Sequence, residues 1–213
     1  MSQNRSNAVM ASRVEAHDSL DFFPSPPWAT RALCDWLRGF EPINSQTAWE
    51  PACGAGDMAR PLAEYFKTVY ASDVHSYGFG EQSDFLFPYA TRHLADWIIT
   101  NPPFRLGQQF IERALLDAGS GVAMLVRTAF LESAERYHGL FRNQAPTDIL
   151  QFVERVPMFK GRLDKHGSTA TAYCWLVWKI GVAQAYGTKF HWLAPCRKRF
   201  ELASDYPSEG ARP

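Results

Sequence analysis

The heptapeptide IITNPPF, Ile98–Phe104, joins an apolar run to residues that can bind and activate an amine. Apolar runs of this kind form buried strands, and this one stops at a carboxamide, two prolines and an aromatic ring. The side-chain oxygen of Asn101 and the carbonyl oxygen of Pro102 can both accept hydrogen bonds from one NH2 group. A tight turn without chemistry is the alternative, because Asn and Pro are common turn residues.

An amine attached to an aromatic ring is a poor nucleophile because its lone pair is delocalised into the ring. Two acceptors on its hydrogens localise that lone pair and aim it at an electrophile, which is catalysis by positioning and fixed dipoles. Pro102 and Pro103 stiffen the loop, and Phe104 offers a stacking face for a base taken out of its helix. The candidate catalytic residues are therefore Asn101, Pro102, Pro103 and Phe104.

Two further segments are suited to a nucleoside. In EPACGAGDMA, Gly54 and Gly56 allow a tight turn before a helix N-terminus, and Glu50 can contact a cationic or polar group. The third glycine of the dinucleotide fingerprint is absent, so a purely structural turn is the alternative. Asp73 ends the strand-like run TVYASDV and can accept hydrogen bonds from both ribose hydroxyls. A helix N-cap or a solvated strand end is the alternative for this aspartate.

The segment SDFL could hold adenine, with Asp84 on its exocyclic amine and Phe85 on its face. An N-cap followed by a core phenylalanine would have the same sequence. An adenosine pocket without a phosphate-binding lysine favours S-adenosylmethionine over a nucleoside triphosphate. The sulfonium methyl of that cofactor is the electrophile that an activated amine requires.

The elements that would position these residues alternate between strands and helices, which is typical of a parallel sheet with helices on both faces. We expect a helix over about 27–39 and another in LGQQFIERALLDAG. The last two strands, in ILQFVERVPMF and TATAYCWLVWKIG, are separated only by a short basic loop, so they should pair antiparallel. Ligands of such sheets bind at the carboxyl ends of the strands, where the candidate residues fall.

The composition is that of a globular protein with one domain, at 213 residues and 46% hydrophobic residues. We expect a loosely attached segment over 1–20, a single domain over 21–202 and a flexible tail over 203–213. No run approaches the length of a membrane helix and no signal peptide is visible, which favours a cytoplasmic protein. Cysteine and histidine spacings predict neither a disulfide framework nor a metal site, and oligomeric state, including a homodimer, stays open.

These residues resemble the class I S-adenosylmethionine-dependent methyltransferases that act on the exocyclic amine of adenine. NPPF resembles their (D/N/S)PP(Y/F/W) motif, EPACGAG their cofactor loop, and DFFPSPPWATRAL the segment that precedes this loop in members with the γ motif order. The resemblance runs from about 21 to 179 and implies a Rossmann-like α/β fold with a seven-stranded, mostly parallel sheet and an antiparallel C-terminal hairpin. The cofactor-binding residues that it implies, together with those above, are Phe23, Pro24, Ser25, Glu50, Pro51, Ala52, Gly54, Gly56, Asp73, Val74, Asp84 and Phe85.

The chain departs from DNA methyltransferases of this group because the residues after Phe104 leave no room for a separate target-recognition domain. Residues 1–126 carry 9 Lys/Arg and 14 Asp/Glu, whereas residues 127–213 carry 13 and 8, so the second half is basic. The best candidate for phosphate contacts is the loop FKGRLDKHGS, although a solvated hairpin loop would have a similar composition. Its candidate nucleic-acid-binding residues are Lys160, Arg162, Lys165 and His166.

The predicted function is methyl transfer to the N6 amine of adenine in DNA, and the expected partner is DNA. RNA adenine-N6 methylation is the nearest alternative, because small RNA enzymes with NPPF or NPPY also lack a recognition domain. Methylation of a protein glutamine and a non-catalytic partner subunit are further alternatives. The intact glycine turn and the intact NPPF sequence argue against the non-catalytic subunit.

Overall fold

The structure, a computed structural model, describes residues 21–87, 94–182 and 187–206, so the expected N-terminal segment 1–20 and residues 207–213 of the expected tail lie outside the described residues. The strands are β1 Thr47–Glu50, β2 Thr68–Asp73, β3 Glu81–Gln82, β4 Ala95–Thr100, β5 Ala118–Arg127, β6 Asp148–Phe152, β7 Tyr173–Lys179 and β8 Lys189–Leu193. The α-helices are α1 Pro27–Leu37, α2 Ala59–Leu62, α3 Gly107–Asp117, α4 Ala134–Arg136, α5 Arg142–Gln144 and α6 Arg197–Phe200. Shorter helical turns are η1 Ile43–Ser45, η2 Thr128–Leu131, η3 Tyr137–Phe141 and η4 Ala203–Asp205.

The described strands form one eight-stranded sheet in the order β3-β2-β1-β4-β5-β7-β6-β8. The five strands from β3 to β5 pair parallel, and β7 pairs antiparallel with both β5 and β6, which confirms the mostly parallel sheet with an antiparallel C-terminal hairpin. The expected number of seven strands is wrong, because β8 adds an edge strand parallel to β6. This edge strand buries little apolar surface, because its large apolar residues Phe190 and Trp192 are 51% and 69% exposed.

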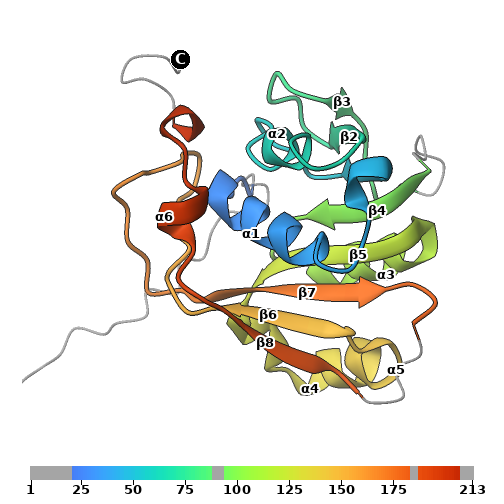
Figure 1. Cartoon of the computed structure of the whole chain (residues 1–213). Helices are drawn as coiled ribbons and strands as arrows, with labels where there is room; N and C mark the ends of the chain where they lie inside the picture. Colours follow the sequence, from blue (N-terminus) through green and yellow to red (C-terminus); the bar gives the residue numbers. More distant parts are fainter. Residues whose placement is uncertain (1–20, 88–93, 183–186, 207–213) are drawn as a thin grey trace, which may run out of the picture.

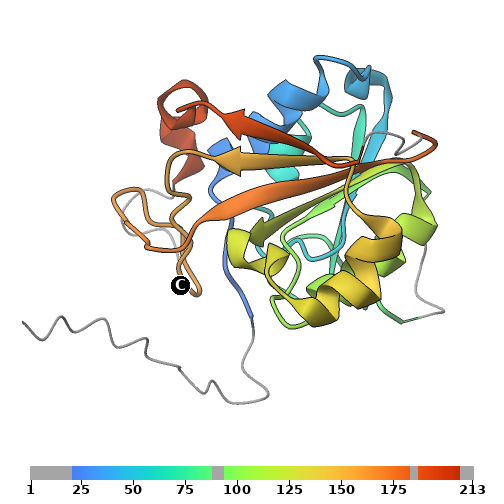
Figure 2. The same ribbon diagram turned by 90° about the horizontal axis from the view of Figure 1, so that it is seen from below.

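Two helical layers cover the sheet (Figures 1 and 2). One face packs against α1 and α2 through a core that includes Trp28, Leu33, Leu62 and Trp175. The opposite face packs against α3 and the helical segment from α4 to α5 through a second core that includes Ile111 and Leu140. Helix α1 begins at Pro27, in the first turn where the missing N–H of proline costs nothing. It ends at Leu37, two residues before the expected end at about 39.

A buried arginine fastens the C-terminal residues to helix α1. Arg31 is 5% exposed, and its guanidinium pairs with Glu64 at 2.7 Å and with Asp205 at 2.8 Å. The same group donates to the carbonyl of Phe200 at 2.8 Å, which ties α6 to α1. Residues 203–206 of the segment that was expected to be a flexible tail are therefore held against the domain.

Strand pairing brings the candidate residues to one edge of the sheet. Strand β1 lies between β2 and β4 with parallel partners on both sides, so the three carboxyl ends are neighbours. Glu50 ends β1, Asp73 ends β2, and Asn101 directly follows β4. The glycine turn and the NPPF loop thus face each other across the ends of adjacent strands.

Candidate active site

A cavity of about 960 Å³ opens at the carboxyl ends of β1, β2 and β4. Of the residues predicted to bind the cofactor or act in catalysis, it is lined by Phe23, Pro24, Ser25, Glu50, Pro51, Ala52, Gly54, Asp73, Val74, Asp84, Phe85, Asn101, Pro103 and Phe104. Gly56 and Pro102 do not line this cavity, and neither do the four candidate nucleic-acid-binding residues. The ends of β1 and β2, the SDFL segment and the NPPF loop therefore line one cavity.

The glycine turn after β1 needs backbone conformations that side chains disfavour. Gly54 and Gly56 have φ angles of 51° and 86°, and a Cβ on Gly56 would lie 2.7 Å from the ring of Phe79. Asp73 holds the turn, because its carboxylate accepts the backbone N–H of Gly54 and that of His75, each at 2.9 Å. Each carboxylate oxygen keeps a further lone pair, so Asp73 is oriented and can still accept hydroxyl groups.

Glu50 is a buried carboxyl group with one oxygen that has no partner. Its side chain is 1% exposed, and Oε1 accepts the hydroxyl of Thr100 at 2.6 Å and the backbone N–H of Ala52 at 3.3 Å. The oxygen Oε2 is buried and has no hydrogen-bond partner among the residues that the structure describes. Burial raises the pKa of Glu50 from 4.5 to about 8, against the lowering effect of the Thr100 hydrogen bond. A cationic group at Oε2 would compensate this cost of burial.

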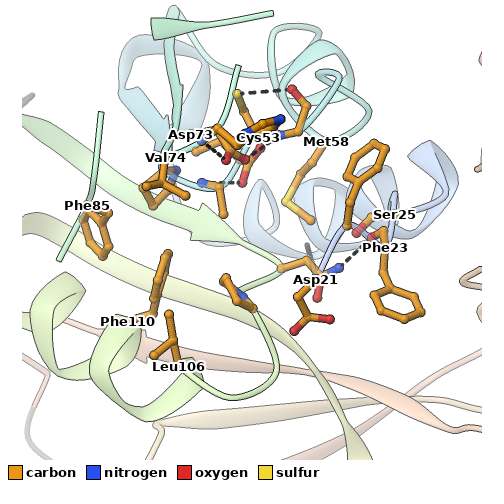
Figure 3. A pocket seen from close by; sticks show the side chains of 18 of the residues that line it. Asp21, Phe23, Ser25, Cys53, Met58, Asp73, Val74, Phe85, Leu106 and Phe110 are labelled. Atoms are coloured by element: carbon orange, nitrogen blue, oxygen red, sulfur yellow. Dashed lines mark hydrogen bonds between the residues drawn. The ribbon is translucent and has the colours of Figure 1, made fainter. Parts of the chain in front are cut away.

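The other end of the cavity has apolar walls. Val74, which is 60% exposed, lies on one side, and Leu106 and Phe110 lie on the opposite side (Figure 3). Phe85 is only 2% exposed and packs edge-to-face on Trp49 with ring centroids 5.1 Å apart. A flat ring such as adenine would therefore lie between Val74 and the α3 side.

The role of Phe85 as an open aromatic face does not fit its burial, because Trp49 and Phe110 pack against its ring. Asp84, in contrast, is exposed at the cavity and accepts the backbone N–H of Leu86 at 2.9 Å. Its second carboxylate oxygen remains suited to an exocyclic amine.

Asn101 presents an oriented acceptor at the end of β4. Its side-chain nitrogen donates to the carbonyl oxygen of Phe23 at 3.0 Å, with the sulfur of Met158 at 3.8 Å. Because a carbonyl only accepts, this contact fixes which way the carboxamide points. The oxygen Oδ1 of Asn101 is buried, and within the described part of the chain no group donates a hydrogen bond to it. A buried acceptor without a partner costs about 1–3 kcal/mol, and a ligand that donates a hydrogen bond to Oδ1 would remove this cost.

Phe104 is enclosed by two side chains. Its ring lies 4.9 Å from that of Phe23, at an interplanar angle of 46°, and the guanidinium carbon of Arg127 lies 3.8 Å from its centroid. Asp21 accepts the backbone N–H of Phe104 at 2.5 Å, which anchors the loop. The face of Phe104 that was expected to be open for stacking is therefore covered by Arg127, an exposed residue at the end of β5.

Residues 21–25, here called the strap, line the cavity, and Asp21, Phe23 and Ser25 lie on the side away from Val74 and Phe85 (Figure 3). Phe22 stacks on Tyr77 with centroids 4.5 Å apart, and its carbonyl accepts the backbone N–H of Gly161 at 2.8 Å. With the Phe23 and Asp21 contacts, the strap connects the β2 end, the NPPF loop and the basic loop after β6. Sequence reasoning placed Phe23, Pro24 and Ser25 here through a resemblance, but it missed Asp21.

The basic loop lies beside the Asn101 end of the cavity. Lys160, Arg162, Lys165 and His166 are all exposed. Arg162 pairs with Asp164 at 3.3 Å, and the carbonyl of Lys165 accepts a hydrogen bond from Arg197 of α6 at 2.5 Å. The loop is therefore attached to both the strap and α6, and it presents its cations at the carboxyl edge of the sheet.

Neither a metal centre nor a membrane span is found in the part of the chain that the structure describes. No group of three His, Cys, Asp or Glu residues there could hold a metal ion. None of the helices that were searched is both long and apolar enough to cross a bilayer. All four cysteines are free and buried, and burial raises the pKa of the Cys53 thiol to about 12.

No model of a known protein family and no curated protein matches the sequence. Among solved structures, the methyltransferase subunit of a type I restriction-modification system from Streptococcus thermophilus is similar, with a TM-score of 0.58, 12% identity, and coverage of 76% of this chain and 45% of that one. The modification subunit of a presumed type I restriction enzyme from Vibrio vulnificus has a TM-score of 0.53 and 14% identity over 91% of this chain and 51% of that one.

A presumed RNA methyltransferase from Pyrococcus horikoshii is also similar, with a TM-score of 0.53, 15% identity, and coverage of 71% of this chain and 83% of that one. The chain therefore spans about half the length of the two restriction-modification subunits and most of the length of the archaeal protein. At these identities the likeness establishes the fold, which is the Rossmann-like fold of methyltransferases.

Proposed function

We propose that the protein is an S-adenosylmethionine-dependent methyltransferase that modifies the N6 amine of adenine in DNA. The observation that carries this proposal is the carboxamide of Asn101, whose nitrogen is held by Phe23 while its oxygen is buried without a partner. An acceptor oriented in this way is suited to one hydrogen of an aromatic amine. The carbonyl of Pro102 is proposed for the other.

The cavity fits the proposed cofactor on three points. Glu50 offers a partnerless buried oxygen to the cationic amino group, and Asp73 offers oriented lone pairs to the ribose hydroxyls. Val74 and Phe110 form walls for adenine. When bound, S-adenosylmethionine supplies a methyl group on a sulfonium sulfur. The residues of this chain hold the amine and localise its lone pair, so its nitrogen can bond to the methyl carbon without a prior general base. The bond from that carbon to sulfur breaks, S-adenosylhomocysteine leaves, and the methylated amine then releases one proton to solvent.

A nucleic acid is favoured as the substrate by the cations around the catalytic loop. Met158 contacts Asn101, and only a few residues later the basic loop presents Lys160, Arg162 and Lys165 at the same edge. These side chains are placed to bind the phosphates that flank an extruded base. The two restriction-modification subunits of similar fold support a DNA substrate.

RNA is the second candidate, and one observation favours it. The presumed archaeal RNA methyltransferase is matched over 83% of its length, so most of a protein named for RNA has the fold of this chain. A loop that reads only phosphates would serve either nucleic acid.

The direct experiment incubates the protein with cofactor labelled in its methyl group and with duplex DNA, single-stranded DNA, total RNA or a glutamine-containing peptide. We expect label on N6 of adenine in DNA, identified by nucleoside digestion and mass spectrometry. Label confined to RNA or to the peptide would reject the DNA assignment. Arg142→Ala, which changes an exposed arginine of α5 outside the cavity, serves as the matched control preparation.

A further inference from the structure

Two cavities meet at one pair of side chains beside the catalytic loop. Asn101 lines the larger cavity, and Pro102 lines a second cavity of about 200 Å³ on the other side of the loop. Of the described residues that line them, only Phe104 and Arg127 line both. Asn101 and Pro102, the two residues proposed to accept hydrogen bonds from one amine, thus line different cavities. The contact between Phe104 and Arg127 separates these cavities.

Arg127 lies where an aromatic base would stack. Its guanidinium, which is flat like a base, is 3.8 Å from the centroid of the Phe104 ring. Within the described part of the chain no carboxylate pairs with it, and its neighbours are this ring and the phenol of Tyr173. The oxygen Oδ1 of Asn101 is also buried, so an incoming amine reaches it only after a neighbouring side chain moves.

We propose that Arg127 occupies the position of the target base on Phe104 and leaves it when a nucleotide of a strand enters. This inference rests on the proposed function. Moving Arg127 away would join the two cavities into one slot, with Asn101 on one side and Pro102 on the other. Every ligand must displace Arg127 from the ring, and only some ligands offer the displaced guanidinium a new partner. Arg127 is then a specificity-determining residue.

The displaced guanidinium needs a new partner, and the second cavity already contains another arginine. Arg136 lines this cavity, and its side chain is held by the carbonyls of Phe130 at 2.7 Å and Glu132 at 3.3 Å. A phosphate of the incoming strand would be a better partner for Arg127 than an aromatic ring, because arginine binds phosphate in a bidentate manner. A free nucleoside displaces Arg127 without offering that phosphate. The slot therefore discriminates against free nucleosides.

The test measures two ligands against Arg127→Ala in the presence of S-adenosylhomocysteine. Binding of labelled deoxyadenosine is followed by equilibrium dialysis, and binding of a short single-stranded oligodeoxyadenylate by fluorescence anisotropy at several salt concentrations. We expect the affinity for deoxyadenosine to rise by about tenfold, since the cation–π contact no longer has to be broken. For the oligonucleotide, the slope of log K against log salt should become shallower by about 0.7, the value for one lost phosphate contact.

Controls separate this inference from the proposed function. Arg127→Lys keeps a cation and should give intermediate values, and Arg142→Ala should match the wild type in both assays. An unchanged or lower deoxyadenosine affinity in Arg127→Ala, beside a wild type that binds deoxyadenosine, would overturn the inference and leave the proposed function standing. If neither protein binds deoxyadenosine while both bind the oligonucleotide, the inference alone is rejected; if neither protein binds the oligonucleotide, the proposed function is rejected with it. A thermal midpoint equal to that of the wild type verifies that the variant is folded.

Discussion

We expect Glu50 to release a proton when the cofactor binds. A variant without this carboxyl group should bind the cofactor without releasing that proton. The carboxyl group is 1% exposed, its pKa is raised from 4.5 to about 8, and its Oε2 has no partner. At pH 7 the group is therefore mostly protonated. A cationic amino group placed at Oε2 would favour the carboxylate, so close to one proton should leave for each cofactor bound.

The magnitude follows from the shift in pKa. Raising the pKa from 4.5 to about 8 corresponds to about 5 kcal/mol in favour of the protonated form in the folded, cofactor-free protein. Because the pKa is higher in the folded state, this contribution to stability is complete below pH 4.5 and is lost progressively as the pH rises towards about 8. Glu50→Gln mimics the protonated acid and should be free of this loss.

Two measurements check this reasoning. Calorimetric titration of S-adenosylhomocysteine in buffers of different ionisation enthalpy should give proton release for the wild type and none for Glu50→Gln. Urea denaturation between pH 5 and about 9 should show the stability of Glu50→Gln increasing relative to the wild type as the pH rises. Equal proton release in both proteins, or a stability difference that does not change with pH, would refute the assignment of Glu50.

Three other substitutions test separate parts of the site and fold. Asp73→Ala should weaken cofactor binding by about tenfold to a hundredfold, and an unchanged calorimetric affinity would rule out the ribose contact. Arg31→Met leaves the buried carboxylate of Asp205 unpaired and should cost about 3–5 kcal/mol in urea denaturation, against less than about 0.5 kcal/mol for the exposed Arg38→Met control. For Lys165→Ala, the slope of log K against log salt for oligonucleotide binding should become shallower by the amount expected for about one phosphate contact. A slope equal to that of the wild type would contradict a phosphate contact by the basic loop at this residue.

Sequence patterns were enough to predict which residues meet at the candidate site where strand order and direction decide their positions. The strands that end at Glu50 and Asp73, and the strand that Asn101 follows, were visible as apolar runs, and parallel pairing of adjacent strands brings their carboxyl ends to one edge. The glycines of the turn were informative because their positive φ angles exclude most other residues. Local chemistry and strand direction together predicted which residues would meet.

Contacts between distant side chains were not predictable in the same way. The orientation of Asn101 depends on the carbonyl of Phe23, which lies 78 residues away in the sequence. The stacking of Arg127 on Phe104 and the burial of Phe85 against Trp49 depend on packing that has no local pattern. A charged or aromatic residue at the end of a strand can point into a cavity, onto a neighbour or into the core, and only the tertiary structure decides.

The most direct test of the amine-binding mechanism measures the rate of methyl transfer by Asn101→Ala in a single turnover, with cofactor affinity measured on the same preparation. Loss of the acceptor oxygen should slow transfer by about a hundredfold to a thousandfold, while cofactor affinity stays close to that of the wild type. Asn101→Asp, which keeps an acceptor at this position, should retain more activity than Asn101→Ala. Transfer by Asn101→Ala at a rate close to that of the wild type would contradict the account.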